Sequence, residues 1–125
     1  MSTEAVQAPE SPAGPHVVEI VRSEEHGSVK LLVPDNLPYF RGHFPDFAIL
    51  PGVVQVDWAV RYARELFPLD GAFPARIKVK FRKPIRPGQS LTLSLKYLPP
   101  QHIVQFDYSD ADGPYASGQI GFAPE

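Results

Sequence analysis

The pattern of apolar and polar positions divides the chain into two short strands, one helix and a run of further strands. Residues 16–22 and 28–33 favour extended structure, with a turn signal at Glu25-His26-Gly27 between them. From residue 52 to residue 67, apolar residues recur every three or four positions, which predicts a helix. The predicted core stripe consists of Val53, Val56, Val60, Ala63 and Phe67, widened by Ala59 and Leu66. Because this helix is apolar over much of its circumference, we expect other structure to surround it.

The rest of the chain predicts about four more strands. Residues 77–82 alternate strictly between apolar and basic side chains, and residues 91–95 alternate again. Two later strands are expected at residues 102–108 and 115–122, after turn signals rich in Pro, Gly and Asp. Short connections imply antiparallel neighbours. One apolar helix on an antiparallel sheet is an α+β arrangement, and the simplest packing wraps the sheet around the helix.

Length and composition define one domain with a polar tail. The chain has 125 residues, the size of a single domain. Residues 1–15 are rich in Pro, Ala, Ser and Glu and offer little to bury, so we expect a disordered N-terminal tail followed by one domain over residues 16–125.

Composition also excludes several kinds of site and partner. The chain has no cysteine, which excludes disulfides, thiolate metal sites and cysteine nucleophiles. Its formal net charge of −2 argues against a duplex nucleic-acid binder. His16, His26 and His102 lack metal-ligand spacing, so no metal site is expected. No apolar run is long enough to span a membrane and no signal peptide is apparent, so we expect a cytoplasmic protein.

The candidate chemistry lies in a proline-rich connection and at the helix start that follows it. His43 stands in Gly42-His43-Phe44-Pro45, Pro51-Gly52 opens the helix, and Asp57 lies in its second turn. Histidine suits proton abstraction near neutral pH. A helix start presents unpaired N–H groups, so the Gly52 N–H could stabilise a carbonyl oxygen that gains negative charge. A base, a carbonyl polariser and an acid suit removal of a proton next to a carbonyl, with loss of a β-leaving group.

Each of these residues also has a purely structural interpretation. His43 could bond backbone in its loop, and Gly52 could be only a tight-turn residue. Asp57 could be a surface carboxylate paired with Arg61, four residues later on the helix. Such a pair would favour the ionised aspartate, which opposes a general-acid role.

At these residues the sequence resembles the 3-hydroxyacyl-acyl carrier protein dehydratases of the hotdog fold. Their hallmark is Gly-His-Phe-Pro, a short spacer, Pro-Gly-Val and an acid a few residues later, and it is matched by Gly42-His43-Phe44-Pro45, Pro51-Gly52-Val53 and Asp57. The resemblance covers roughly residues 16–123. The segment from Pro45 to Trp58 is most similar to the aryl polyene biosynthesis branch of the family.

The resemblance implies a reaction, a set of residues and an assembly. The fold would be a hotdog, with about five to six strands around one central helix. His43 would remove the C2 proton, Asp57 would protonate the departing 3-hydroxyl, and the Gly52 N–H would polarise the thioester carbonyl to give a trans-2-enoyl thioester. The acyl chain would run beside the helix near Phe44, Pro51, Val53, Val56 and Arg61. The histidine and the acid of one site would come from different subunits of a homodimer, with higher oligomers or heteromers open. The family needs no cofactor beyond the phosphopantetheine of the carrier.

Two departures from the family pattern and a basic patch complete the expectations. Arg61 stands where fatty-acid members commonly carry glutamine, and Ala48 stands where proline is usual. Basic side chains could form a solvated face or a docking surface for the acidic carrier protein. These are Arg41, Lys78, Lys80, Arg82, Lys83 and Arg86.

Two alternative functions stay open from the sequence. A hotdog thioesterase would activate water with an acid on the helix and would not need Gly-His-Phe-Pro. A non-catalytic hotdog subunit would support an active partner, and Arg61 keeps that interpretation open.

Overall fold

A computed structural model of the chain describes residues 14–37, 48–69 and 71–124. The elements follow the chain as β1 (His16–Arg22), β2 (His26–Leu32), α1 (Gly52–Leu66), β3 (Phe73–Phe81), β4 (Ser90–Leu98), the short 3-10 helix η3 (Pro99–Gln101), β5 (Ile103–Asp110) and β6 (Gly113–Ala123). The predicted tail, residues 1–13 in particular, and the segment 38–47 lie outside the described residues.

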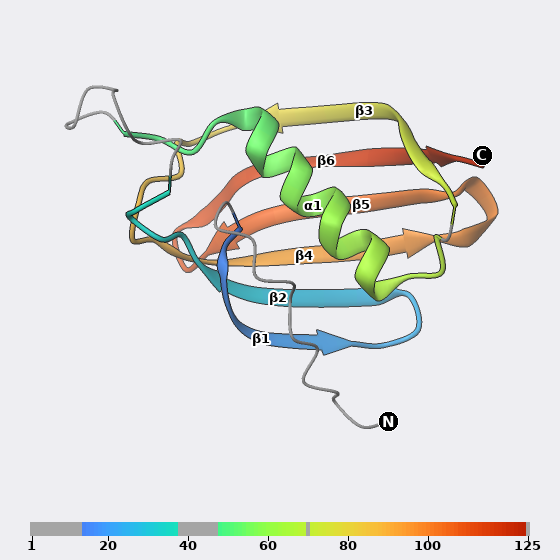
Figure 1. Ribbon diagram of the computed structural model, residues 1–125, viewed down its shortest axis with the longest axis horizontal. Helices are drawn as coiled ribbons and strands as arrows, with labels where there is room; N and C mark the ends of the chain where they lie inside the picture. The colour runs from blue at the N-terminus through green and yellow to red at the C-terminus, as the bar shows by residue number, and fades with distance from the viewer. Residues whose placement is uncertain (1–13, 38–47, 70, 125) are drawn as a thin grey trace.

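All six strands form one antiparallel sheet, in the order β1-β2-β4-β5-β6-β3, and α1 crosses one face of it (Figure 1). The expected α+β arrangement, an antiparallel sheet of about six strands with one long helix against it, is confirmed. Helix α1 separates the hairpin β1-β2 from β3 in the chain, and it lies diagonally over the sheet between them. Because β3 pairs with β6 alone among the described strands, its other edge is open.

The core lies between α1 and the inner face of the sheet. Alternation along β4 buries Leu91, Leu93 and Leu95 under the helix and leaves Ser94 and Lys96 exposed. The largest fully buried side chains include Trp58 and Tyr62 of α1 and Tyr108 of β5. Burial of such apolar surface is the main force that holds the helix on the sheet.

The phase of the helix differs in part from the predicted stripe. Val60, Ala63 and Phe67 are buried as expected and Val56 is half-buried, but the side chain of Val53 is 77% exposed. Val54 takes the core position instead, in line with Trp58 and Tyr62. The apolar pattern is compatible with either Val53 or Val54 in the core. The helix takes the rotation that buries Val54, because this rotation also encloses the large side chains of Trp58 and Tyr62.

The bounds of two strands also differ from the predicted ones. β3 begins at Phe73 rather than at residue 77, and β2 begins at His26, which places the turn at residues 23–25. A turn bond from the Ser23 N–H to the His26 carbonyl, 2.9 Å long, closes this hairpin. Such shifts are expected, because pairing with a neighbouring strand extends an element beyond its own alternating residues.

Candidate active site

The start of α1 presents backbone N–H groups that the helix itself does not use. Pro51 is the N-cap, and its carbonyl accepts bonds from the N–H groups of Val54 (3.0 Å) and Gln55 (3.1 Å). The first turn contains no acidic residue and no side-chain cap among the residues that the structure describes. The Gly52 N–H therefore lies at the positive end of an uncapped helix, as the sequence predicts for a carbonyl-polarising group.

Gly52 is closely packed by an aromatic ring from the edge strand. A Cβ atom built on Gly52 would lie 2.5 Å from Cζ of Phe81, the last residue of β3. A larger residue here would therefore have to displace the Phe81 ring, and glycine avoids this contact in addition to any role toward a ligand. The Phe81 ring is 50% exposed in the single chain, so one of its faces is open to a further contact.

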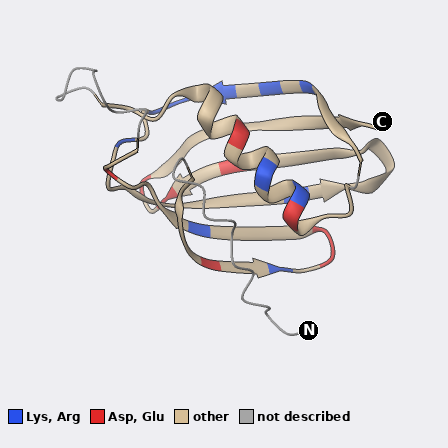
Figure 2. Cartoon of the chain, viewed as in Figure 1, with Lys and Arg blue, Asp and Glu red and all other residues tan. Residues whose placement is uncertain are grey.

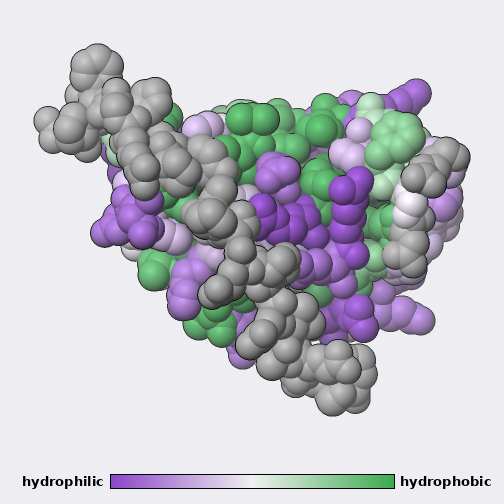
Figure 3. All heavy atoms as spheres, in the orientation of Figure 1, coloured by the Kyte–Doolittle hydropathy of each residue, from purple (hydrophilic) through white to green (hydrophobic). Residues whose placement is uncertain are grey.

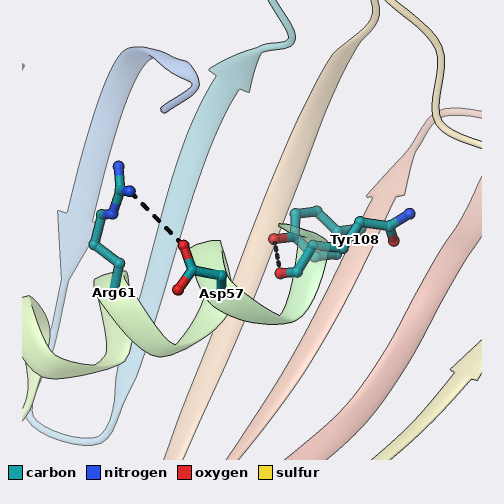
Figure 4. Close-up of polar contacts among 4 residues, drawn as sticks. Asp57, Arg61 and Tyr108 are labelled. Carbon is teal, nitrogen blue, oxygen red and sulfur yellow. Dashed lines mark hydrogen bonds and ion pairs between the residues drawn. The ribbon is translucent and has the colours of Figure 1, made fainter. Parts of the chain in front are cut away.

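Asp57 and Arg61 project from the same side of α1, away from the sheet (Figure 4). The Nη2 atom of Arg61 lies 3.8 Å from the Oδ2 atom of Asp57, which confirms the predicted contact over one helical turn. The Asp57 side chain is 66% exposed and that of Arg61 is 24% exposed. An ion pair of this length and exposure contributes little energy, so it leaves the carboxyl free for other partners.

A buried tyrosine of the sheet contacts the inner side of α1 in this region. The Tyr108 hydroxyl donates a 2.6 Å hydrogen bond to the backbone carbonyl of Gln55, and Figure 4 shows its ring reaching from the sheet to the helix. Burial raises the pKa of Tyr108 well above its usual value, with further contributions from Tyr62 and Asp57. The Tyr108 hydroxyl therefore remains a protonated donor at neutral pH.

Gln55 is a component of the site that the sequence analysis missed. It is the buried polar side chain of the described core, and its Nε2 donates a 3.0 Å bond to the Leu50 carbonyl. An amide on the buried face of an otherwise apolar helix was the available signal, because a buried amide is costly unless it is hydrogen-bonded.

The structure brings together only part of the predicted site. Gly52 and Asp57 lie five residues apart on α1, with Pro51, Val53, Val56 and Arg61 around them. His43, Phe44 and Arg41 lie outside the described residues. Their predicted roles, like those of the other site residues, stay predictions.

The predicted basic patch is spread along and beyond the edge strand (Figure 2). Lys78 and Lys80 face away from the core, because they alternate with Ile77, Val79 and Phe81 on the inner side of β3. Arg82 and Arg86 are exposed beyond the end of the strand.

Lys83, by contrast, is engaged within the chain. Its Nζ donates a 3.1 Å bond to the Asp112 carbonyl and lies 4.6 Å from the centre of the Tyr115 ring. These contacts hold it on the β5-β6 turn, so it is less available to a partner than its neighbours.

Apolar surface gathers at the open edge of the sheet. In Figure 3, green surface lies along the upper rim over β3 and the beginning of α1, and purple surface crosses the middle of the helix. Large exposed apolar side chains in this region are Ile49, Val53, Phe73, Ile77 and Phe81. Exposed apolar side chains that gather along one edge of a sheet are typical of an interaction site.

The sequence of the chain matches a known family of proteins. The family model described as ApeI-like, ApeI dehydratase, matches residues 19–119. The 3-hydroxyacyl-[acyl-carrier-protein] dehydratase FabZ of Clostridium perfringens is 36% identical over 98 residues, which cover 70% of this chain and 70% of that protein. The match to FabZ of Syntrophobacter fumaroxidans is also 36% identical, over 66% of this chain and 60% of that protein.

Solved structures agree with this assignment. The dehydratase heterocomplex ApeI:P from Xenorhabdus doucetiae contains a chain with a TM-score of 0.80 and 32% identity, covering 87% of this chain and 97% of that one. An uncharacterized protein from Erwinia carotovora subsp. atroseptica has a TM-score of 0.73 and 31% identity, over 88% of this chain and 96% of that one. None of the helices in the described part of the chain is long and apolar enough to cross a membrane. The resemblance seen in the sequence is thereby confirmed, and the chain belongs to the ApeI-like dehydratase family of hotdog-fold proteins.

Proposed function

We propose that this chain is a 3-hydroxyacyl-[acyl-carrier-protein] dehydratase, a hydro-lyase of fatty acid-like or aryl polyene biosynthesis. One observation carries the proposal: a chain of the ApeI-like dehydratase family presents an uncapped helix start at Gly52 and an exposed carboxyl group at Asp57, five residues later on the same helix. The FabZ relatives are named for this reaction. The fold alone would not assign an activity, but the family and the helix-start geometry do so together.

Three groups would share the elimination of water. His43 takes the C2 proton, and the electrons of that C–H bond form the new double bond to C3 as the C3–O bond breaks. Asp57 gives its proton to the departing hydroxyl, so that water leaves and a trans-2-enoyl thioester remains. The Gly52 N–H stabilises the charge that develops on the thioester oxygen.

A second copy of the chain would complete the site. In the single chain the Asp57 side chain is two-thirds exposed, whereas a group that transfers a proton to substrate works best in a site that excludes water. The open edge of β3 and the apolar side chains beside it, such as Val53 and Phe81, favour a self-complementary contact. A homodimer formed there would cover Asp57, exclude water and bring His43 of one subunit to the acid of the other.

The carrier protein would dock on the basic residues of the edge strand. Lys78, Lys80 and Arg82 are exposed and face away from the core, where they can meet an acidic partner without disturbing the fold. Arg41 and Arg86 would extend this surface. The acyl group arrives on the carrier's phosphopantetheine, so the chain would need no metal or other cofactor of its own, and we place the reaction in the cytoplasm.

The test is an intact-mass assay on a 3-hydroxyacyl carrier protein. The expected result is loss of the mass of one water, and His43→Ala and Asp57→Asn should each lower the rate by about 100-fold or more. Asp35→Asn, in an exposed loop, is the control and should have no effect. Release of the free acid would instead identify a thioesterase, and activity only with a second kind of subunit would identify a supporting role.

Co-expression of the two inactive variants tests the shared site. If His43 and Asp57 act across the dimer, a heterodimer of His43→Ala with Asp57→Asn contains one intact site. Random pairing would then restore about a quarter of the wild-type activity. No recovery from heterodimers shown to form would refute the exchange of residues between subunits.

A further inference from the structure

The buried amide of Gln55 ties together the segment that presents the Gly52 N–H. Gln55 is 4% exposed, and it lies in the first turn of α1. Its side chain turns back to donate to the Leu50 carbonyl, two residues before Gly52. The Leu50 N–H in turn donates a 2.7 Å bond to the Ile85 carbonyl, so this residue is held on both of its backbone polar groups.

A second hydrogen bond joins the first turn of α1 to the sheet. The Tyr108 hydroxyl, on β5, donates to the backbone carbonyl of Gln55. The sheet therefore holds Gln55, and Gln55 holds Leu50. The peptide unit between Pro51 and Gly52 lies inside this closed set of bonds, and its own carbonyl is fixed by the N–H groups of Val54 and Gln55.

Gln55 also carries a cost that packing alone does not explain. Its Oε1 atom is buried and has no hydrogen-bond partner among the described residues. An unpaired buried acceptor is unfavourable, and an apolar side chain of the same length would avoid it. What an apolar side chain could not provide is the bond to the Leu50 carbonyl.

We infer that Gln55 is a positioning residue for the dehydration: through the Leu50 carbonyl it holds the Gly52 N–H in the direction of the thioester oxygen. The inference rests on the proposed function, because it deepens the role proposed for Gly52. Hydrogen bonds aimed at a developing charge act only when their direction is fixed in advance. The Gln55 side chain does not touch the substrate in this scheme.

The experiment compares Gln55→Met with wild type in two measurements. The first is steady-state kinetics on a 3-hydroxyacyl carrier protein. Because the Gly52 N–H acts most strongly in the transition state, kcat should fall by about 10- to 100-fold, with KM changed less than about threefold. Tyr108→Phe removes the second tie and should lower kcat in the same way. Gln105→Met, on the exposed outer side of β5, is the matched control and should leave both parameters unchanged.

The second measurement reports the hydrogen bond directly. A trans-2-enoyl pantetheine thioester with carbon-13 at the carbonyl is bound, and its C=O stretching frequency is recorded by difference infrared spectroscopy. Wild type and Asp57→Asn should both lower this frequency relative to the free thioester, and Gln55→Met should lose most of the shift. A variant that has only lost stability would keep the shift in its folded fraction.

The outcomes separate the inference from the proposed function. If Gln55→Met keeps both its kcat and the infrared shift, the positioning role is wrong and the dehydratase stands. If wild type shows no infrared shift, the positioning role is wrong as well. If wild type does not dehydrate the carrier-bound substrate, the proposed function fails, and the infrared comparison still decides whether Gln55 aligns Gly52.

Discussion

The two ends of α1 are held on the sheet by different kinds of contact. At its start, from Leu50 to Asp57, directed hydrogen bonds from Gln55 and Tyr108 fix the backbone, and Val53 is exposed beside them. At its end, Leu66 and Phe67 are buried among other apolar side chains. Hydrogen bonds thus fix the orientation of the backbone at the start of α1, and apolar packing fixes the position of its end.

Apolar contacts at the end of α1 attach the helix to strands β2 and β4. Phe67 stacks on Tyr97 of β4 with ring centroids 5.2 Å apart, and Leu66 packs against Gly27 of β2. The Arg22 side chain adds a 3.0 Å bond to the Leu66 carbonyl. Apolar packing of this kind supplies stability but no orientation that a ligand could use. Apolar packing therefore holds the last residues of α1 on the core, and the proposed site lies at its first turns.

The largest expected effect is on stability, at the anchored end. Phe67→Ala removes the stack on Tyr97 and leaves a cavity in the core, so it should lower the free energy of unfolding by about 3–5 kcal/mol. Urea unfolding measures the loss, and Phe67→Leu, which keeps most of the apolar volume, should cost clearly less. The kcat per folded molecule should not change. A large fall in kcat at a temperature where the variant is folded would show that the two ends are not independent.

An intermediate effect comes from the same substitution made at each end. Gly27→Ala places its Cβ 2.6 Å from Cδ1 of the buried Leu66, and this overpacking should cost about 1–3 kcal/mol with dehydration unchanged. Gly52→Ala meets the half-exposed ring of Phe81, which can move aside, so it should cost less than about 1 kcal/mol but lower kcat. Denaturant unfolding and the intact-mass assay measure the two quantities.

The double variant Gly52→Ala with Phe81→Leu tests whether the collision with the Phe81 ring causes the loss of kcat. The smaller side chain should relieve the collision and restore part of kcat, if displacement of the helix start is the cause of the loss. An equal stability cost at both glycines, with no change in activity, would refute the division between the two ends.

The smallest expected effect is a pH dependence in the second half of the helix. Burial raises the pKa of Glu65 above its ordinary value of 4.5, and Arg61 lowers it in part. The folded chain therefore holds this proton more tightly than the unfolded chain does, so stability falls as pH rises through the interval above 4.5. Glu65→Gln removes this loss and should raise Tm by about 1–2 °C at pH 7, with the gain vanishing below about pH 4.

Glu24→Gln, on the exposed β1-β2 turn, is the control for this prediction and should show no such trend. A gain from Glu65→Gln that is equal at both pH values would show that the carboxylate is not the cause.

The sequence predicted much of the fold because its signals are local. Strict alternation at residues 77–82 and 91–95 located two strands, and Pro51-Gly52 located the helix start within one residue. The contact between Asp57 and Arg61 followed from helical spacing alone. Each of these depends only on residues a few positions apart.

Other features were decided by contacts between distant parts of the chain. The phase of α1 placed Val54 rather than Val53 in the core, because Trp58 and Tyr62 must be enclosed by the sheet. The bond from Tyr108 to the helix joins residues 53 positions apart. The hydrogen bond from Gln55 to the Leu50 carbonyl is local in sequence, but the Gln55 amide is buried only because the sheet covers it.

The family, the element order and the position of Gly52 and Asp57 on one helix could be inferred from the residues alone, because the motif and the helical spacing are local in sequence. Three features instead depend on tertiary contacts: β3 pairs with β6 alone among the described strands, Phe81 packs on Gly52, and Gln55 is buried. These depend on how the sheet closes around the helix, and that closure is set by the summed packing of the whole core and by no single segment.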